Sequence, residues 1–107
     1  MKAAKDKEQG ASVQRIKNGH AQKRAKAWKT VLSTREGRMV VWEILKFTKL
    51  FAEAFTGNSQ TFYNEGRQSV GKWIYKRIDP DNFDEYIEMR REAQRREAAE
   101  QEEIDNA

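Results

Sequence analysis

The chain has 107 residues, of which 36% are charged and 37% hydrophobic, and its formal net charge is +4. This length allows one small domain, and the absence of cysteine excludes a disulfide framework and a thiolate metal site. The N-terminal sequence has no apolar run of the kind found in signal peptides. No segment approaches the roughly eighteen apolar residues of a membrane span. We therefore expect a soluble protein.

The charges are unevenly distributed along the chain. Residues 1–35 carry ten basic and two acidic side chains, which gives +8, and residues 36–78 carry seven and four, which gives +3. Residues 79–107 carry four basic and eleven acidic side chains, which gives −7. Such asymmetry is typical of a protein whose ends meet an anionic and a basic partner. The alternative is that both ends are solvated tails.

The N-terminal third is basic and poor in apolar groups. Residues 1–20 contain two glycines and many charges, which predicts a mobile arm unless a partner binds it. Residues 21–32 are rich in helix formers and favour a short basic helix. We treat residues 1–32 as one basic arm.

The next segment has the pattern of a helix over about 35–48. Ser33 is a candidate N-cap, and Glu36 follows three residues later, the spacing of a capping box. The apolar residues recur at helical rather than strand spacing. They are Val40, Ile44 and Phe47, with Val41 and Leu45 alongside. This apolar surface is wide, so we expect the central helix of the domain.

Two further helices follow. The turn cluster Thr56-Gly57-Asn58-Ser59 separates them from the central helix, and Asn58 or Ser59 can cap a helix over about 60–78. Asp79-Pro80-Asp81 breaks the chain again, and Pro80 suits the first turn of a third helix.

The third helix is predicted to dock only at its start. Phe83, Tyr86, Ile87 and Met89 supply apolar groups there, whereas the residues beyond Arg90 show no apolar face. Pairs three and four residues apart support an exposed helix, and Glu92 has this spacing to both Arg95 and Arg96. We expect a helix that projects from the core.

These elements predict an all-α protein. Its folded part is a small three-helix unit over residues 33–90. A basic arm (1–32) precedes the unit, and a charged helical tail (91–107) follows it.

The stretch GRQSVGKW, Gly66 to Trp73, nearly matches a phosphate-binding loop. Such a loop follows a buried strand and ends in Gly-Lys-Ser or Gly-Lys-Thr, whose hydroxyl binds magnesium. Here the preceding residues are polar, and the last position is Trp73. The stretch therefore indicates a helix with two glycines.

Glycines inside a helix require a reason, because each costs about 1 kcal/mol relative to alanine. Close approach of another helix is the reason we infer. Phe62, Gly66, Val70 and Trp73 recur at intervals of three and four and so share a face. The residues predicted to serve helix packing or assembly are Trp42, Phe62, Gly66, Val70, Gly71 and Trp73.

The central segment carries a recognisable set of residues. They are Arg38, Trp42, Leu45, Phe51, Phe55-Thr56-Gly57, the run Phe62-Tyr63-Asn64-Glu65-Gly66-Arg67-Gln68-Ser69-Val70-Gly71, Tyr86 and Met89-Arg90. The pattern Phe-x-Asn-Glu-Gly-Arg-x-Ser-Val-Gly is the most specific part.

This set, which covers residues 35–92, resembles a family of small tailed-bacteriophage proteins. Members of that family are usually encoded among the virion genes and have no known enzymatic activity. The resemblance implies a phage setting and a structural or DNA-ejected virion component. It supplies no catalytic residues and does not fix the place in the particle.

Candidate catalytic and metal-binding groups are sparse. His20 is the only histidine, and paired carboxylates such as Glu85 and Glu88 are typical of a solvated helix face. We expect no enzyme, no cofactor and no metal site.

Binding chemistry is better supported. The residues predicted to contact an anionic partner are Lys17, Lys23, Arg24, Lys26, Lys29, Arg35 and Arg38. On DNA they would give salt-dependent affinity without sequence preference. The same arm could instead dock on an acidic portal, tail or ejection protein.

The leading hypothesis is a non-enzymatic phage virion protein, structural or ejected with the genome. It would assemble in the host bacterial cytoplasm with portal, tail or ejection proteins, and we expect a homo-oligomer or ring. The rival is a nonspecific DNA-binding accessory or regulator that acts through the basic arm.

Overall fold

The computed structural model describes residues 2–52, 57–79 and 81–107, and side chains from residue 6 onward. It contains the helices α1 (Lys2–Leu32), α2 (Arg35–Thr48), α3 (Gln60–Ile78) and α4 (Phe83–Asp105). No strand occurs among the residues described. The prediction of an all-α fold is confirmed. The described residues form four helices, of which α1 takes the place of the predicted basic arm and its short helix.

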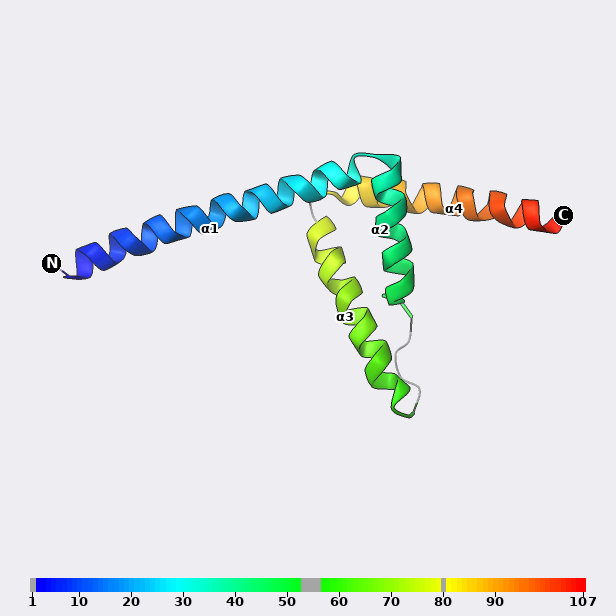
Figure 1. The fold of residues 1–107 in the computed structure, drawn as a ribbon, viewed down its shortest axis with the longest axis horizontal. Coiled ribbons are helices and arrows are strands. Elements are labelled where there is room, and N and C mark those ends of the chain that lie inside the picture. The colour runs from blue at the N-terminus through cyan, green and yellow to red at the C-terminus, as the bar shows by residue number, and fades with distance from the viewer. Residues whose placement is uncertain (1, 53–56, 80) are drawn as a thin grey trace.

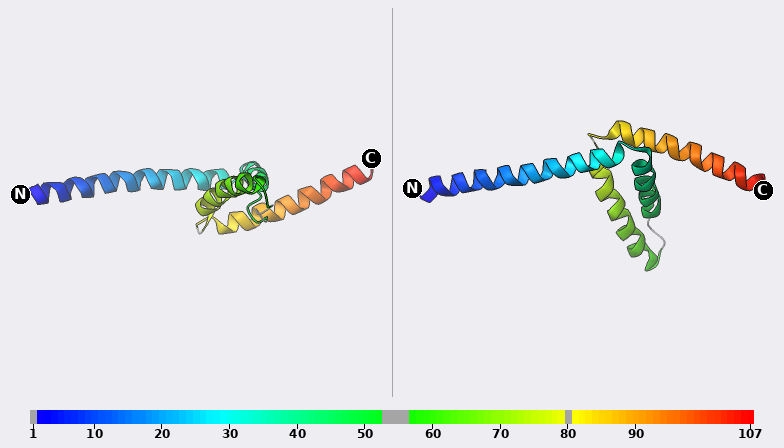
Figure 2. Two further views of the ribbon diagram at one scale, coloured as in Figure 1. Left: turned by 90° about the horizontal axis from the view of Figure 1, so that it is seen from below. Right: turned by 45° about the horizontal axis from the view of Figure 1, so that its top comes forward.

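The molecule is elongated. Figure 1 shows α1 and α4 projecting toward opposite ends, with α2 and α3 extending to one side from the middle. The principal extents are 77, 39 and 17 Å, and the radius of gyration is 20.1 Å. A compact domain of this length would have a radius of gyration of about 13 Å. The turned views in Figure 2 show the same separation of the two ends.

The predicted mobile arm is instead part of one continuous helix. α1 runs from Lys2 to Leu32, and its side chains from residue 6 to residue 27 are exposed except at Gly19. Only the C-terminal end packs on the rest of the molecule, where Trp28 is half-buried and Leu32 fully buried. The core therefore reaches back beyond the predicted start of the unit at residue 33.

The corner between α1 and α2 is tight. Thr34, rather than Ser33, caps α2, because its hydroxyl oxygen accepts a hydrogen bond from the Gly37 amide at 3.0 Å. The Ser33 hydroxyl instead donates to the carbonyl oxygen of Thr30 at 2.6 Å. A Cβ atom at Gly37 would overlap the carbonyl oxygen of Val31. The close approach of the two helices thus requires glycine here.

The core lies where the four helices meet. Its buried side chains are Leu32, Val41, Leu45, Ile74, Ile78, Tyr86 and Met89. The prediction of helix 35–48 is confirmed in type and bounds, but its buried face is the stripe through Val41, Leu45 and Thr48. Val40, Ile44 and Phe47 lie on an exposed face.

The prediction that GRQSVGKW forms part of a helix is confirmed, since the whole stretch lies inside α3. The two glycines differ in their surroundings. A Cβ atom at Gly71 would overlap the Thr48 hydroxyl oxygen and lie 2.9 Å from the Thr48 Cβ, whereas a Cβ at Gly66 would meet nothing within 4 Å. Close helix approach within the chain thus accounts for Gly71, and the same explanation is wrong for Gly66.

The α2–α3 connection is held by side-chain amides. The carboxamide oxygen of Asn58 accepts a hydrogen bond from the Gln60 amide at 2.9 Å, whereas Ser59 makes no capping hydrogen bond. The Gln68 side chain donates to the carbonyl oxygens of Lys49 and Ala52. These bonds fix the end of α2 against the middle of α3.

The last helix contributes to the core along its first three turns. α4 begins at Phe83, and the prediction that Pro80 starts this helix falls outside the described residues. Tyr86, Met89 and Ala93 are buried, so the core also extends past residue 90. The Tyr86 ring meets the Tyr75 ring edge to face, with centroids 5.4 Å apart.

The contrast between the two glycines gives a stability prediction. Gly66→Ala should raise the free energy of unfolding by about 0.5–1 kcal/mol, because the methyl group enters open space and alanine favours a helix. Gly71→Ala should lower it by about 1–3 kcal/mol, because the methyl group overpacks the contact with Thr48. Urea unfolding followed by circular dichroism measures both. A gain in stability for Gly71→Ala would contradict the close contact.

Candidate assembly surface

Arg38 lies at the junction of three helices. Its Nε donates to Glu92 Oε1 at 2.8 Å, and its Nη1 donates to the carbonyl oxygen of Leu32 at 3.0 Å. The Arg38 and Glu92 side chains are only 15% and 9% exposed. Arg38 is therefore engaged inside the protein, and its prediction as a contact for an anionic partner is wrong.

The same ion pair corrects the prediction for Glu92. Glu92 was expected to pair with Arg95 or Arg96 along the exposed helix, but its partner is Arg38, 54 residues away. Arg95 instead lies 4.0 Å from Glu88, an exposed and weak contact. α4 is thus tied to α2 by a partly buried charge pair in addition to its apolar core contacts.

The other predicted anion contacts are exposed. Arg35 lies at the start of α2, and the five on α1 are Lys17, Lys23, Arg24, Lys26 and Lys29. At 3.6 residues per turn they point to several sides of α1 and do not form one stripe. They therefore distribute positive charge around the circumference of α1.

One side of α2 exposes large apolar side chains. Val40, Ile44 and Phe47 follow each other at intervals of four and three residues, and their exposed fractions run from 44% at Ile44 to 63% at Phe47. Glu92 and Glu97 of α4 pair with Arg38 and Lys46 of α2. These two α2 side chains lie on the side of the helix opposite the exposed stripe. The exposed stripe of α2 thus faces away from α4.

α3 carries a second exposed apolar stripe. Phe62 is 77% exposed, and Val70 and Trp73 are 52% and 51% exposed. The Trp73 ring meets Trp28 of α1 edge to face at 6.1 Å, and the Arg77 guanidinium stacks 3.3 Å from the Trp73 ring centroid. Trp73 therefore has contacts on one side and remains open on the other.

Arg67 joins the two stripes. Its guanidinium lies 5.6 Å from the ring centroid of Phe47 and 4.8 Å from that of Tyr63. α2 and α3 run side by side, as Figure 1 shows. The exposed apolar side chains of the two helices are here together called the apolar face; they are Val40, Ile44, Phe47, Phe62, Tyr63, Val70 and Trp73.

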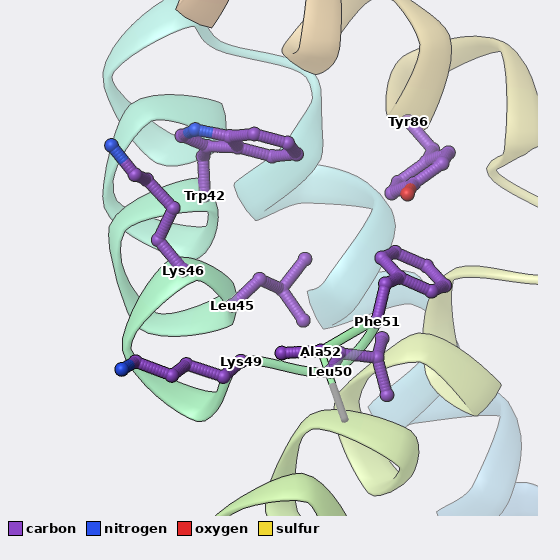
Figure 3. A pocket seen from close by; sticks show the side chains of 8 residues that line it. All are labelled: Trp42, Leu45, Lys46, Lys49, Leu50, Phe51, Ala52 and Tyr86. Carbon is purple, nitrogen blue, oxygen red and sulfur yellow. The ribbon is translucent and has the colours of Figure 1, made fainter. Parts of the chain in front are cut away.

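An apolar pocket of about 240 Å³ opens at the C-terminal end of α2. Its lining comes from α2, the following segment and α4, and Figure 3 shows these side chains: Trp42, Leu45, Lys46, Lys49, Leu50, Phe51, Ala52 and Tyr86. Leu45 and Leu50 point toward its centre, whereas the ammonium groups of the two lysines point away from it. The pocket suits an apolar side chain.

Two ionisable groups near the pocket have shifted pKa values. Lys46 donates a hydrogen bond to Glu97 at 2.8 Å, which lowers the pKa of the Glu97 carboxyl below its ordinary value. Burial raises the pKa of the Tyr86 hydroxyl, and the nearby Arg90 partly opposes this effect. Both shifts follow from the docking of α4 on α2.

The residues predicted for packing or assembly divide into two groups. Phe62, Gly66, Val70 and Trp73 do share a face, as their spacing predicts, but that face is exposed. Trp42 and Gly71 instead contact the interior. Arg67, which lies between Phe47 and Tyr63, was not among the predicted assembly residues, and its signal in the sequence is the spacing of four residues from Tyr63.

The described part of the chain has neither a cluster of metal-binding side chains nor a membrane-spanning helix. No group of three or more His, Asp or Glu side chains there could hold a metal ion. No helix over those residues has the length and apolar character of a membrane span.

These features define a small all-helical protein with a large exposed apolar face. The family model of the Bbp19-like phage proteins matches residues 28–90. The match covers more than half of the chain, and the chain belongs to this phage protein family. No curated protein sequence and no solved structure matches it.

The Arg38–Glu92 pair gives a second stability prediction. Arg38→Ala should lower the free energy of unfolding by about 3 kcal/mol, because it leaves the Glu92 carboxylate buried without its counter-charge. The matched control is Arg95→Ala, which removes an exposed partner and should cost less than about 0.5 kcal/mol. Urea unfolding compares the two variants. Equal losses would show that Arg38 does not join the helices.

Proposed function

We propose that the protein is a non-enzymatic component of the phage particle, structural or ejected with the genome, which assembles with portal, tail or ejection proteins. The observation that carries this proposal is the set of large exposed apolar side chains on α2 and α3, the apolar face. Membership of a phage protein family supports it. On this proposal the chain is made in the host bacterial cytoplasm and is carried in the virion.

The size and composition of the apolar face favour a protein partner. Monomeric proteins rarely expose large contiguous apolar patches, and such patches mark interaction sites. Aromatic residues and arginine are enriched where proteins bind each other. Here Arg67 lies against Phe47 and Tyr63, and Phe62 and Trp73 are exposed on the same helix as Arg67. Covering these side chains would contribute about 1.5–3 kcal/mol for each one fully buried.

The marginal core also favours assembly. Eight apolar side chains are buried among the described residues, and small domains bury a lower fraction of their surface than large ones. A binding partner that recognises only the folded state adds stability by mass action. An assembled particle would supply such a partner.

A non-enzymatic role fits the chemistry of the pocket. Apart from Lys46, Lys49 and the Tyr86 hydroxyl, its lining is apolar, and the two ammonium groups point outward (Figure 3). The pocket thus offers a place for an apolar side chain of a partner rather than a pair of groups for acid–base chemistry.

A second candidate function is nonspecific DNA binding through α1. The observation that favours it is the run of residues 9–35, which carries seven basic and no acidic side chains. Contacts of these residues with phosphates would make the affinity for duplex DNA fall steeply with added salt. An affinity that does not change with salt would exclude this function.

Incorporation into particles tests the leading proposal. A phage that lacks the gene is complemented with Phe62→Ser or Val70→Ser, and the copy number per purified particle is measured by quantitative mass spectrometry. We expect a loss of about tenfold or more, because each exposed apolar side chain that is buried contributes at least about 1.4 kcal/mol.

The control is Lys72→Ser, which changes an exposed side chain on the polar side of the same helix. It should be incorporated at the wild-type level. Absence of the wild-type protein from particles would refute the virion role, and undiminished incorporation of both apolar-face variants would refute docking through that face.

A further inference from the structure

Two blocks of opposite charge occupy the two projecting helices. Residues 9–35 contain seven basic and no acidic side chains, and residues 97–107 contain five acidic and no basic ones. Of these acids, Glu97 pairs with Lys46. The remaining four are Glu100, Glu102, Glu103 and Asp105, and all are exposed.

The two blocks cannot meet within one chain. α1 and α4 both run roughly along the 77 Å axis and point away from each other, so the two termini lie at opposite ends (Figures 1 and 2). The C-terminal half of α4 projects past α2, as Figure 1 shows. Apart from the Lys46–Glu97 pair, a partner of opposite charge for either block must therefore come from another molecule.

Each projecting helix also carries charge that its own dipole opposes. The N-terminus of a helix favours negative charge and its C-terminus favours positive charge. α1 has no acid in its first turn, and α4 has no basic residue in its last turn. Both free ends would therefore be stabilised by an oppositely charged helix alongside.

We propose that two copies of the chain form an antiparallel dimer in which α4 of each copy lies along α1 of the other. A two-fold axis perpendicular to the long axis brings both helix pairs together at once and closes the assembly. In this arrangement the acidic end of α4 approaches the basic α1, and the two helix dipoles oppose each other. The proposal goes beyond the proposed function, which names other phage proteins as partners.

The register is consistent with exposed apolar side chains on both helices. Ile104 of α4 is 67% exposed, and Val13 and Ile16 of α1 are exposed as well. When Ile104 lies against Val13 and Ile16, the preceding turns of α4 run along α1 toward its C-terminal half. Because both helices rise 1.5 Å per residue, Glu103 then lies close to Arg15 and Glu100 close to Lys17.

A second copy explains more than a nucleic acid does. DNA would neutralise the basic block of α1 and would leave the acidic block of α4 unpartnered. One dimer interface accounts for both blocks, for their placement at opposite ends and for their charge at the helix termini.

Charge reversal on the full-length purified protein tests the proposal. The first variant combines Arg15→Glu, Lys17→Glu and Lys23→Glu, and the second combines Glu100→Lys, Glu102→Lys and Glu103→Lys. Light scattering after size-exclusion chromatography gives the mass at about 0.05 M and about 0.5 M salt. The wild type should be a dimer at low salt and dissociate at high salt.

Each variant alone should dimerise at least about a hundredfold more weakly, because two copies of each reversed helix then repel their partners. An equimolar mixture should form a 1:1 heterodimer, since one variant has two acidic arms and the other two basic ones. The chain that carries all six substitutions should dimerise like the wild type. Lys72→Glu with Lys76→Glu, on exposed positions of α3, is the matched control and should also dimerise normally.

Other outcomes would overturn the proposal. A wild type that stays monomeric at low salt would do so, and binding of α1 to a duplex DNA of about 20 base pairs would then assign the basic block to nucleic acid. A dimer that persists in every variant and at high salt would place the contact on another surface. Circular dichroism verifies that each variant is folded. The apolar face is unchanged in all of them, so failure here leaves docking in the particle untouched.

Discussion

The arrangement of the helices depends on the contacts of the Arg38 side chain. Its guanidinium bonds to Glu92 of α4 and to the carbonyl oxygen of Leu32, the last residue of α1. Carbonyls at the end of a helix have no partner within the helix, so Arg38 satisfies one of them while it neutralises a carboxylate that is 9% exposed. One side chain of α2 thereby fixes both α1 and α4, and its loss would leave two polar groups unpaired.

This contact decides which side of α2 is covered. Because α4 lies on the side of Arg38 and Lys46, the stripe through Val40, Ile44 and Phe47 stays open, and Arg67 connects it to α3. The molecule thus separates two kinds of surface. The middle presents an apolar face, whereas the projecting ends of α1 and α4 present charge of opposite sign. These surfaces suit different partners and can act at the same time.

The sequence predicted the bounds of α2 and α3 correctly, but it did not predict which of their sides are buried. Helices 35–48 and 60–78 were predicted with the bounds that the structure has, because caps, turns and periodicity are local signals. α2 is apolar on more than one side, so its spacing could not distinguish the buried stripe from the exposed one.

Gly66 and Gly71 look alike in sequence, and only the contact of Gly71 with Thr48, on another helix, distinguishes them. The Arg38–Glu92 pair joins residues 54 apart and left no local signal. The shared face of Phe62, Val70 and Trp73 was recognised, but whether it is buried or exposed depends on which side of α3 packs against α2.

The central claim is that the apolar face is covered by other proteins in the phage particle. Hydroxyl-radical footprinting of the protein in intact particles and in the free state measures this directly, because it reports the solvent exposure of individual side chains. We predict strong protection of Phe47, Phe62, Tyr63 and Trp73 in particles, with little change at the buried Met89. Equal labelling of the four aromatic side chains in both states would contradict the account.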